Sequence, residues 1–170
     1  MNEPRGASIA FQRGLVNTSP GCLSAYLGKY LHEYPWEWWA TVTFRDDPVD
    51  YGAWRRIREF LTWLERKQGR PVGAFIALEL HRYRGNGDPA SLVPHFHLLV
   101  LNVAGVSRKA AWRYLYTRCG RSRIEPYNPD RGASYYISKY IGKECLGRGD
   151  WDIWRPEVIK NAGKPLWTAI

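Results

Sequence analysis

Two short apolar runs, residues 72–81 and 94–102, restrict the fold of this chain more than any other feature of the sequence. Between them lies a polar, glycine-containing segment, residues 82–93, which predicts a long hairpin loop. Two apolar runs joined in this way are expected to pair as antiparallel strands. Strands that follow one another without an intervening helix favour an antiparallel sheet over the parallel sheet of a βαβ fold.

Two other segments carry strong periodic patterns. Residues 36–44 alternate apolar side chains with Thr41 and Thr43, which is the period of a strand. Residues 50–68 place apolar side chains at helical spacing, and Gly69 follows as a stop signal. We therefore expect a strand and a long helix at these two positions.

Weaker patterns complete the expected fold. Ser107 is a suitable N-cap, because its hydroxyl can accept a hydrogen bond from a backbone N–H of the first helical turn. The remaining expected elements are helices at 22–34, 107–118 and 132–143 and a strand at 122–127, followed by an aromatic tail. Together the elements predict an α+β fold, a central antiparallel β-sheet with flanking helices. Residues 1–20 lack periodicity and are expected to form a flexible arm, whereas residues 21–170 suit a single domain.

Charge and aromatic content narrow the class of partner. The 25 Lys and Arg against 16 Asp and Glu give a net charge of +9, which favours an anionic partner such as nucleic acid or an acidic membrane surface. Aromatic residues make up 15% of the chain, which suits a folded core with surfaces for base stacking. The 3 cysteines lack CxxC or CxxH spacing, so they indicate neither a disulfide framework nor a structural zinc site. Without a secretory h-region or a long apolar segment, we expect a cytoplasmic protein that has no membrane partner.

A His-x-His pair opens the second apolar run. On a strand, His95 and His97 are expected on one face and Phe96 on the other. Glu79 and His81 have the same spacing on the first run, so strand pairing predicts a cluster of one carboxylate and up to three imidazoles. Such a cluster suits a divalent cation with Glu79, His95 and His97 as ligands. In this arrangement His81 would contact the ligands and not the ion itself. The alternative is a group of side chains that only pack and hydrogen-bond.

A second group of reactive side chains falls in residues 134–143. At 3.6 residues per turn, Tyr136 and Tyr140 share one helix face, and Lys139 and Lys143 each follow a tyrosine by three residues. A phenol is a poor nucleophile near neutral pH because its pKa is about 10, so its attack on a phosphodiester needs a Lewis acid or a nearby cation. Beside a metal cluster, the pattern indicates phosphodiester cleavage by a tyrosine. In isolation, the same pattern is typical of an amphipathic packing helix.

These motifs carry a family resemblance. The segment from His95 to His97 resembles the His-hydrophobic-His motif of the HUH endonuclease superfamily, and residues 136–143 are similar to the tyrosine motif of its rolling-circle replication initiators, the Rep proteins. The tyrosines follow the histidines, as in those initiators. Residues 39–44 look like the family's first motif, a strand that touches DNA, which implies DNA contacts for Thr41 and Thr43. Glu79 occupies the place of the family's third metal ligand.

The resemblance implies a ferredoxin- or RRM-like nuclease fold and a reaction. In that reaction Tyr136 or Tyr140, aided by Lys139, attacks a phosphate of single-stranded DNA, becomes linked to the 5′ end and releases a 3′-OH that primes rolling-circle replication. Tyrosines four apart also resemble the two-tyrosine initiators of phages and plasmids. The implied cofactor is Mg²⁺ or Mn²⁺, although imidazole ligation by itself would also accept zinc or cobalt. The implied partners are a single-stranded replication origin and a host helicase and polymerase, in the cytoplasm of the host cell.

Two other functions fit the same residues. A transposase of the same superfamily shares both motifs, and a non-catalytic single-stranded-DNA-binding module would use the histidines and tyrosines for packing and stacking. The basic, aromatic stretch 108–123 is either a track for a DNA backbone or a solvated helix face whose Trp112 and Leu115 belong to the core. On the first interpretation Arg113 contacts DNA, and Lys143 is a further contact.

Overall fold

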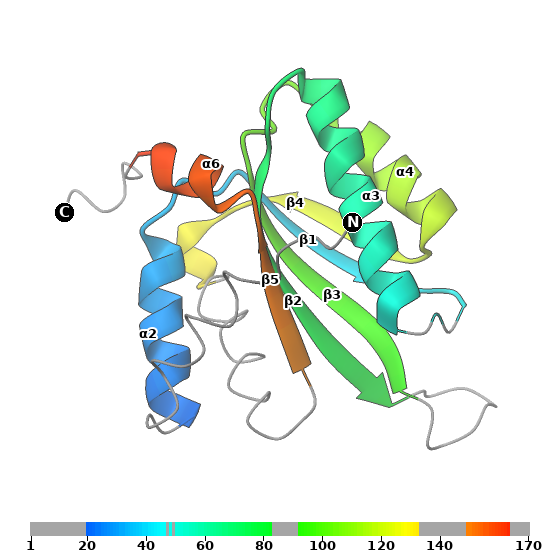
Figure 1. Cartoon of the computed structure of the whole chain (residues 1–170), viewed down its shortest axis with the longest axis horizontal. Coiled ribbons are helices and arrows are strands. Elements are labelled where there is room, and N and C mark those ends of the chain that lie inside the picture. Colours follow the sequence, from blue (N-terminus) through cyan, green and yellow to red (C-terminus); the bar gives the residue numbers. More distant parts are fainter. Residues whose placement is uncertain (1–19, 47, 49, 83–91, 133–148, 164–170) are drawn as a thin grey trace, which may run out of the picture.

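One five-stranded antiparallel sheet lies at the centre of the fold (Figure 1). This computed structural model describes residues 20–46, 48, 50–82, 92–132 and 149–163. The strand order is β4-β1-β3-β2-β5, so β3 is central and β4 and β5 are the edges. The strands are β1 Trp38–Thr43, β2 Gly73–Arg82, β3 Leu92–Leu101, β4 Ser122–Pro126 and β5 Gly149–Trp154. The predicted α+β fold with a central antiparallel sheet is confirmed.

Helices cover both faces of the sheet (Figure 1). The helices α3 Asp50–Gln68 and α4 Arg108–Arg118 pack on one face, and α2 Pro20–His32 and α6 Pro156–Asn161 pack on the other. The bounds of α3 agree with the prediction, and the predicted N-cap of α4 is present, because the Ser107 hydroxyl accepts from the Ala110 N–H. The first helix begins and ends two residues earlier than the predicted 22–34.

The central strand separates two hydrophobic cores. Phe96 and Leu98 of β3 are buried under α3 and α4, whereas Leu99 and Leu101 are buried under α2 and α6. Because strand side chains alternate, a one-residue slip of β3 would bring each set to the wrong face. The apolar pattern therefore fixes the register, and the register fixes where the polar residues of β3 lie.

The C-terminal part of the fold differs from the prediction. The sequence predicts an aromatic tail there, but residues 149–154 form the edge strand β5 and residues 156–161 form α6. The strand alternates Trp151 and Ile153, which join the core under α2, with Asp150 and Asp152. Short-range pattern misses this strand because its partner, β2, lies about seventy residues away in the sequence.

Two further predictions concern residues at the limits of the structure. The predicted helix 132–143 does not begin at Gly132, because this residue closes a 3-10 helix, Pro129–Arg131, in a left-handed conformation with φ 63°. The rest of that predicted helix and the predicted arm up to residue 19 lie outside the described residues.

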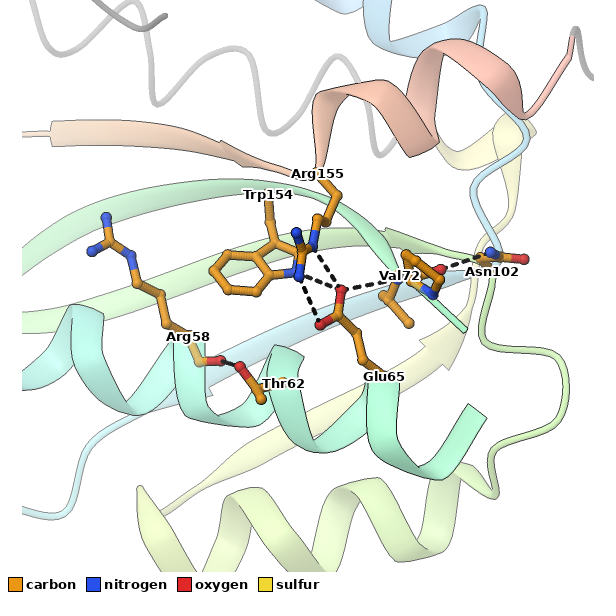
Figure 2. Close-up of polar contacts among 8 residues, drawn as sticks. Arg58, Thr62, Glu65, Val72, Asn102, Trp154 and Arg155 are labelled. Atoms are coloured by element: carbon orange, nitrogen blue, oxygen red, sulfur yellow. Dashed lines mark hydrogen bonds and ion pairs between the residues drawn. The ribbon is translucent and has the colours of Figure 1, made fainter. Parts of the chain in front are cut away.

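A partly buried carboxylate ties β5 and α6 to the end of α3 (Figure 2). Glu65 of α3 accepts hydrogen bonds from Val72 N–H at 3.3 Å, Trp154 Nε1 at 3.2 Å and Arg155 Nε at 3.0 Å. Burial by itself would raise the pKa of Glu65, but these hydrogen bonds, above all the one from Arg155, outweigh it and lower that pKa. The edge strand is thus held by a charged anchor in addition to its pairing with β2.

Candidate functional site

The predicted metal ligands meet on the sheet face that carries α2. In the hairpin of β2 and β3, Glu79 pairs with His95 and Ala77 pairs with His97. On the other side of β3, Thr43 of β1 pairs with His95 and Thr41 pairs with His97. The face therefore presents two adjacent rows across three strands, one containing Glu79, His95 and Thr43, and the other containing His97 and Thr41.

His97 and Glu79 contact each other within this group. His97 Nε2 lies 3.5 Å from Glu79 Oε2, and the residue is only 3% exposed. The Glu79 side chain is 12% exposed. The rings of His95 and His97 are 4.6 Å apart in an edge-to-face arrangement, and Trp39 covers His97 with a centroid distance of 5.6 Å. A charged carboxylate or imidazolium held this far from water requires a counter-charge or a metal ion.

Thr43 orients the second imidazole. Its Oγ1 lies 2.7 Å from His95 Nδ1 in a partly buried hydrogen bond. If Nε2 of His95 binds a cation, Nδ1 carries the proton and donates it to Thr43. A hydrogen bond of this kind sets both the tautomer and the ring orientation of a metal-binding histidine. The sequence predicted a DNA contact for Thr43 and did not predict this bond, because it depends on the pairing of β1 with β3.

The group fits a divalent cation in ligand type and partly in geometry. Two ligand atoms that each lie about 2.1 Å from one ion are about 3.0–3.4 Å apart for bond angles between about 90° and the tetrahedral angle. The 3.5 Å between His97 Nε2 and Glu79 Oε2 is close to this range. In the described part of the chain, no three His, Cys, Asp or Glu side chains already form a complete ligand set. Binding by Glu79, His95 and His97 would therefore require adjustment of at least one side chain.

The structure describes only the backbone of one remaining predicted site residue and none of the other four. His81 pairs with Val93 on the hairpin, and its side chain is not among those described. Tyr136, Lys139, Tyr140 and Lys143 lie outside the described residues. Gly149, the first described residue after the tyrosine motif, pairs with Glu79 of β2. The residues that follow the tyrosine motif thus enter the sheet beside the predicted metal ligands.

Exposed basic residues lie on both faces of the sheet around the site. Arg123 of β4 pairs with Thr41 and therefore lies on the same sheet face as His97, two strands away. Its guanidinium is exposed and bonds to Glu125 at 2.8 Å. The predicted DNA contact Arg113 is exposed on α4, which packs against β4. Strand alternation would have identified Arg123 as a site neighbour once the pairing of β1 with β4 was known.

Comparisons of the chain with protein-family models, with curated proteins and with solved structures give no significant match. Among the helices of the described residues, none is both long enough and apolar enough to cross a membrane.

Proposed function

We propose that this protein is a metal-dependent enzyme that nicks and joins single-stranded DNA through a 5′-phosphotyrosine and so initiates rolling-circle replication. The observation that carries the proposal is the hairpin register, which pairs Glu79 with His95 and brings Glu79 within 3.5 Å of His97. Two imidazoles and one carboxylate on a shielded sheet face form a ligand set suited to a divalent cation. The net charge of +9 suits a polyanionic substrate.

Each residue of the site has a defined role in this proposal. Glu79, His95 and His97 hold Mg²⁺ or Mn²⁺, and Thr43 keeps the His95 ring in the orientation needed for binding through Nε2. The bound ion would polarise the scissile phosphate. The buried surroundings of His97 strengthen the electrostatic interactions of the site, because water is largely excluded there.

Tyr136 or Tyr140 supplies the nucleophile. The phenol gives its proton to water, its oxygen forms a bond to phosphorus while the bond from phosphorus to the 3′ oxygen breaks, and the 3′ oxygen takes a proton from water to become the 3′-OH. Lys139 offsets the negative charge that develops on the phosphoryl oxygens. Tyr140 is nine residues before Gly149, and nine residues span at most about 30 Å. Because Gly149 pairs with Glu79, the tyrosine motif is within reach of the site.

The reaction defines the partners and the setting of the protein. The substrate is a single-stranded replication origin, and the released 3′-OH serves a host polymerase. In this proposal a host helicase separates the strands. These partners place the proposed activity in the cytoplasm of a host cell.

Covalent trapping tests the proposal directly. The full chain is incubated with Mn²⁺ and single-stranded DNA labelled at its 3′ end, which stays with the adduct, or at its 5′ end, which marks the released fragment, and products are separated under denaturing conditions. We expect an adduct that survives denaturation and that requires the metal. His95→Ala and His97→Ala should abolish it, whereas His32→Ala, which changes a histidine on α2, should retain it. Circular dichroism of each variant shows whether the fold is intact.

Phenylalanine variants identify the nucleophile. Loss of all adduct in Tyr136→Phe with full activity in Tyr140→Phe indicates one nucleophile, whereas activity in both single variants and none in the double variant indicates alternation. Tyr135→Phe serves as the matched control, because this residue is about 100° away on a helix. Absence of any adduct in wild type, or normal nicking by folded His97→Ala in saturating metal, would refute the proposed function.

A further inference from the structure

Two stacked aromatic rings are exposed on α4. Trp112 and Tyr116 are 40% and 51% exposed, and their ring centroids are 5.0 Å apart with an interplanar angle of 24°. The helix does not need them for its own packing, because its buried side consists of Ala111 and Leu115. Rings left in water at helical spacing, one turn apart, form an apolar patch that the fold itself does not explain.

Neighbouring groups hold these rings in place. Trp112 Nε1 donates to Ser122 O of β4 at 3.1 Å. The Arg45 guanidinium lies 5.3 Å from the centre of the Tyr116 ring, and its Nη2 donates to the Tyr116 carbonyl oxygen. The hydrogen bond and the cation–π contact reduce the freedom that the rings would lose on binding a ligand, so the surface is preorganised.

The surroundings of the rings are positively charged. The segment from Ser107 to Ile124 contains no acidic residue. Its exposed basic residues are Arg108, Lys109, Arg113, Arg118, Arg121 and Arg123. Two carboxylates on neighbouring segments are engaged in ion pairs, since Asp46 pairs with Arg56 and Glu125 pairs with Arg123. The surface therefore suits a polyanion that also offers flat, apolar rings.

We propose that Trp112, Tyr116 and Arg45 form a base-stacking platform for single-stranded DNA. The inference deepens the proposed function, on which it rests, by adding a second DNA contact to the same protein. Single strands expose both a charged backbone and unpaired bases, and proteins bind them by combining basic grooves with aromatic stacking. In a duplex the bases are stacked on one another, so the rings would have no role in its binding.

The platform and the candidate metal site lie near the same end of β1, on opposite faces of the sheet. Arg45 follows Thr43 by two residues, a step of roughly 7 Å along an extended chain, and Thr43 bonds to His95. Gly120, at the turn between α4 and β4, approaches this end of β1 closely. A Cβ there would lie 2.7 Å from Arg45 N and 2.8 Å from Thr43 O. A DNA strand that stacks on the platform therefore lies near the end of β1 that carries the site.

Equilibrium binding of a labelled oligothymidine in EDTA tests the platform separately from the chemistry, because neither metal nor nucleophile is needed. Trp112→Ala and Tyr116→Ala should each weaken binding about tenfold. Tyr51→Ala is the matched control, since Tyr51 is a 77% exposed ring on α3 and should leave the affinity unchanged. Trp112→Phe should bind more tightly than Trp112→Ala, because it keeps a ring.

Salt dependence distinguishes stacking from charge. Arg113→Ala should reduce the slope of log affinity against log salt by about 0.7, whereas Trp112→Ala should weaken binding at every salt concentration with the slope unchanged. At saturating DNA, Trp112→Ala should still form the covalent adduct. If wild type forms no adduct but the oligothymidine affinities are as expected, only the proposed function is refuted. Affinity of Trp112→Ala equal to that of Tyr51→Ala, or an equal loss for duplex DNA, would overturn the platform. The platform would also be overturned if Trp112→Ala lost self-association of the protein while its DNA binding stayed unchanged, because the rings would then be a contact between copies of the chain.

Discussion

Replacing Thr43 by valine tests the most specific contact of the candidate site. Valine keeps the β-branched shape and suits a strand, but it removes the oxygen that lies 2.7 Å from His95 Nδ1. The cost to folding should be small, because a single hydrogen bond contributes about 0.5–1.5 kcal/mol. For a chain of this size, that corresponds to a fall in Tm of about 2–4 °C per kcal/mol.

The cost to metal binding should be larger. Removing a partner that orients a metal-binding histidine typically lowers metal affinity about 10- to 100-fold, or about 1.4–2.7 kcal/mol. We expect Thr43→Ser to restore most of the affinity, because serine returns the hydroxyl. Thr41→Val is the matched control, because Thr41 lies on the same strand and face but pairs with His97, whereas Thr43 is the residue that pairs with His95 and bonds to its Nδ1.

Titration of the full chain with Mn²⁺ measures this effect without any DNA. Calorimetry gives the dissociation constant of each variant, and thermal unfolding without metal gives its stability. The reasoning fails if Thr43→Val binds Mn²⁺ as tightly as wild type while His95→Ala does not bind. It also fails if Thr41→Val weakens binding as much as Thr43→Val.

Three further predictions concern stability and reactivity. Because hydrogen bonds lower the pKa of Glu65, its stabilising effect is present above its unfolded pKa of about 4.5 and is lost as pH falls through the folded pKa. Urea unfolding should therefore show that Glu65→Gln costs about 1–3 kcal/mol at pH 7 and less at acidic pH, and an equal loss at both pH values contradicts this. Burial raises the pKa of the Cys119 thiol to about 11. A variant that lacks the other two cysteines should therefore react with iodoacetamide at pH 8 far more slowly when native than when unfolded in urea, and equal rates would exclude this explanation. Gly120→Ala should lower Tm, because Gly120 has φ 148° and its new Cβ would meet backbone atoms of Thr43 and Arg45; an unchanged Tm would show that the turn can shift.

Much of the hairpin was predictable because strand geometry leaves few choices. The period of two required His95 and His97 to share a face, and pairing of adjacent runs made Glu79 their neighbour. The contact between Thr43 and His95 was not predictable in the same way. It depends on which strand lies on the other side of β3, and that choice is made by packing between residues more than fifty positions apart.

The helix α4 shows a second limit of sequence patterns. Its sequence contains two apolar pairs at the same spacing, Ala111 with Leu115 and Trp112 with Tyr116. Helical periodicity predicts that each pair shares a face, but it does not say which pair meets the core. The interpretation that placed Trp112 in the core is wrong, because the smaller pair packs against the sheet and the larger rings remain exposed. Close packing between α4 and α3 explains the choice, since Tyr114 already stacks there on Trp63.

The central position of β3 has a consequence for the motions of the site. His95 and His97 belong to a strand that is hydrogen-bonded on both sides, so their amides should exchange with solvent only when the whole domain opens. The backbone that carries the two imidazoles then has the full rigidity of the core before any ligand arrives. A cation or a DNA strand would not have to order this backbone, and no affinity is lost to that entropy. The edge strands β4 and β5, each paired on one side, can open locally while the two histidines keep their spacing.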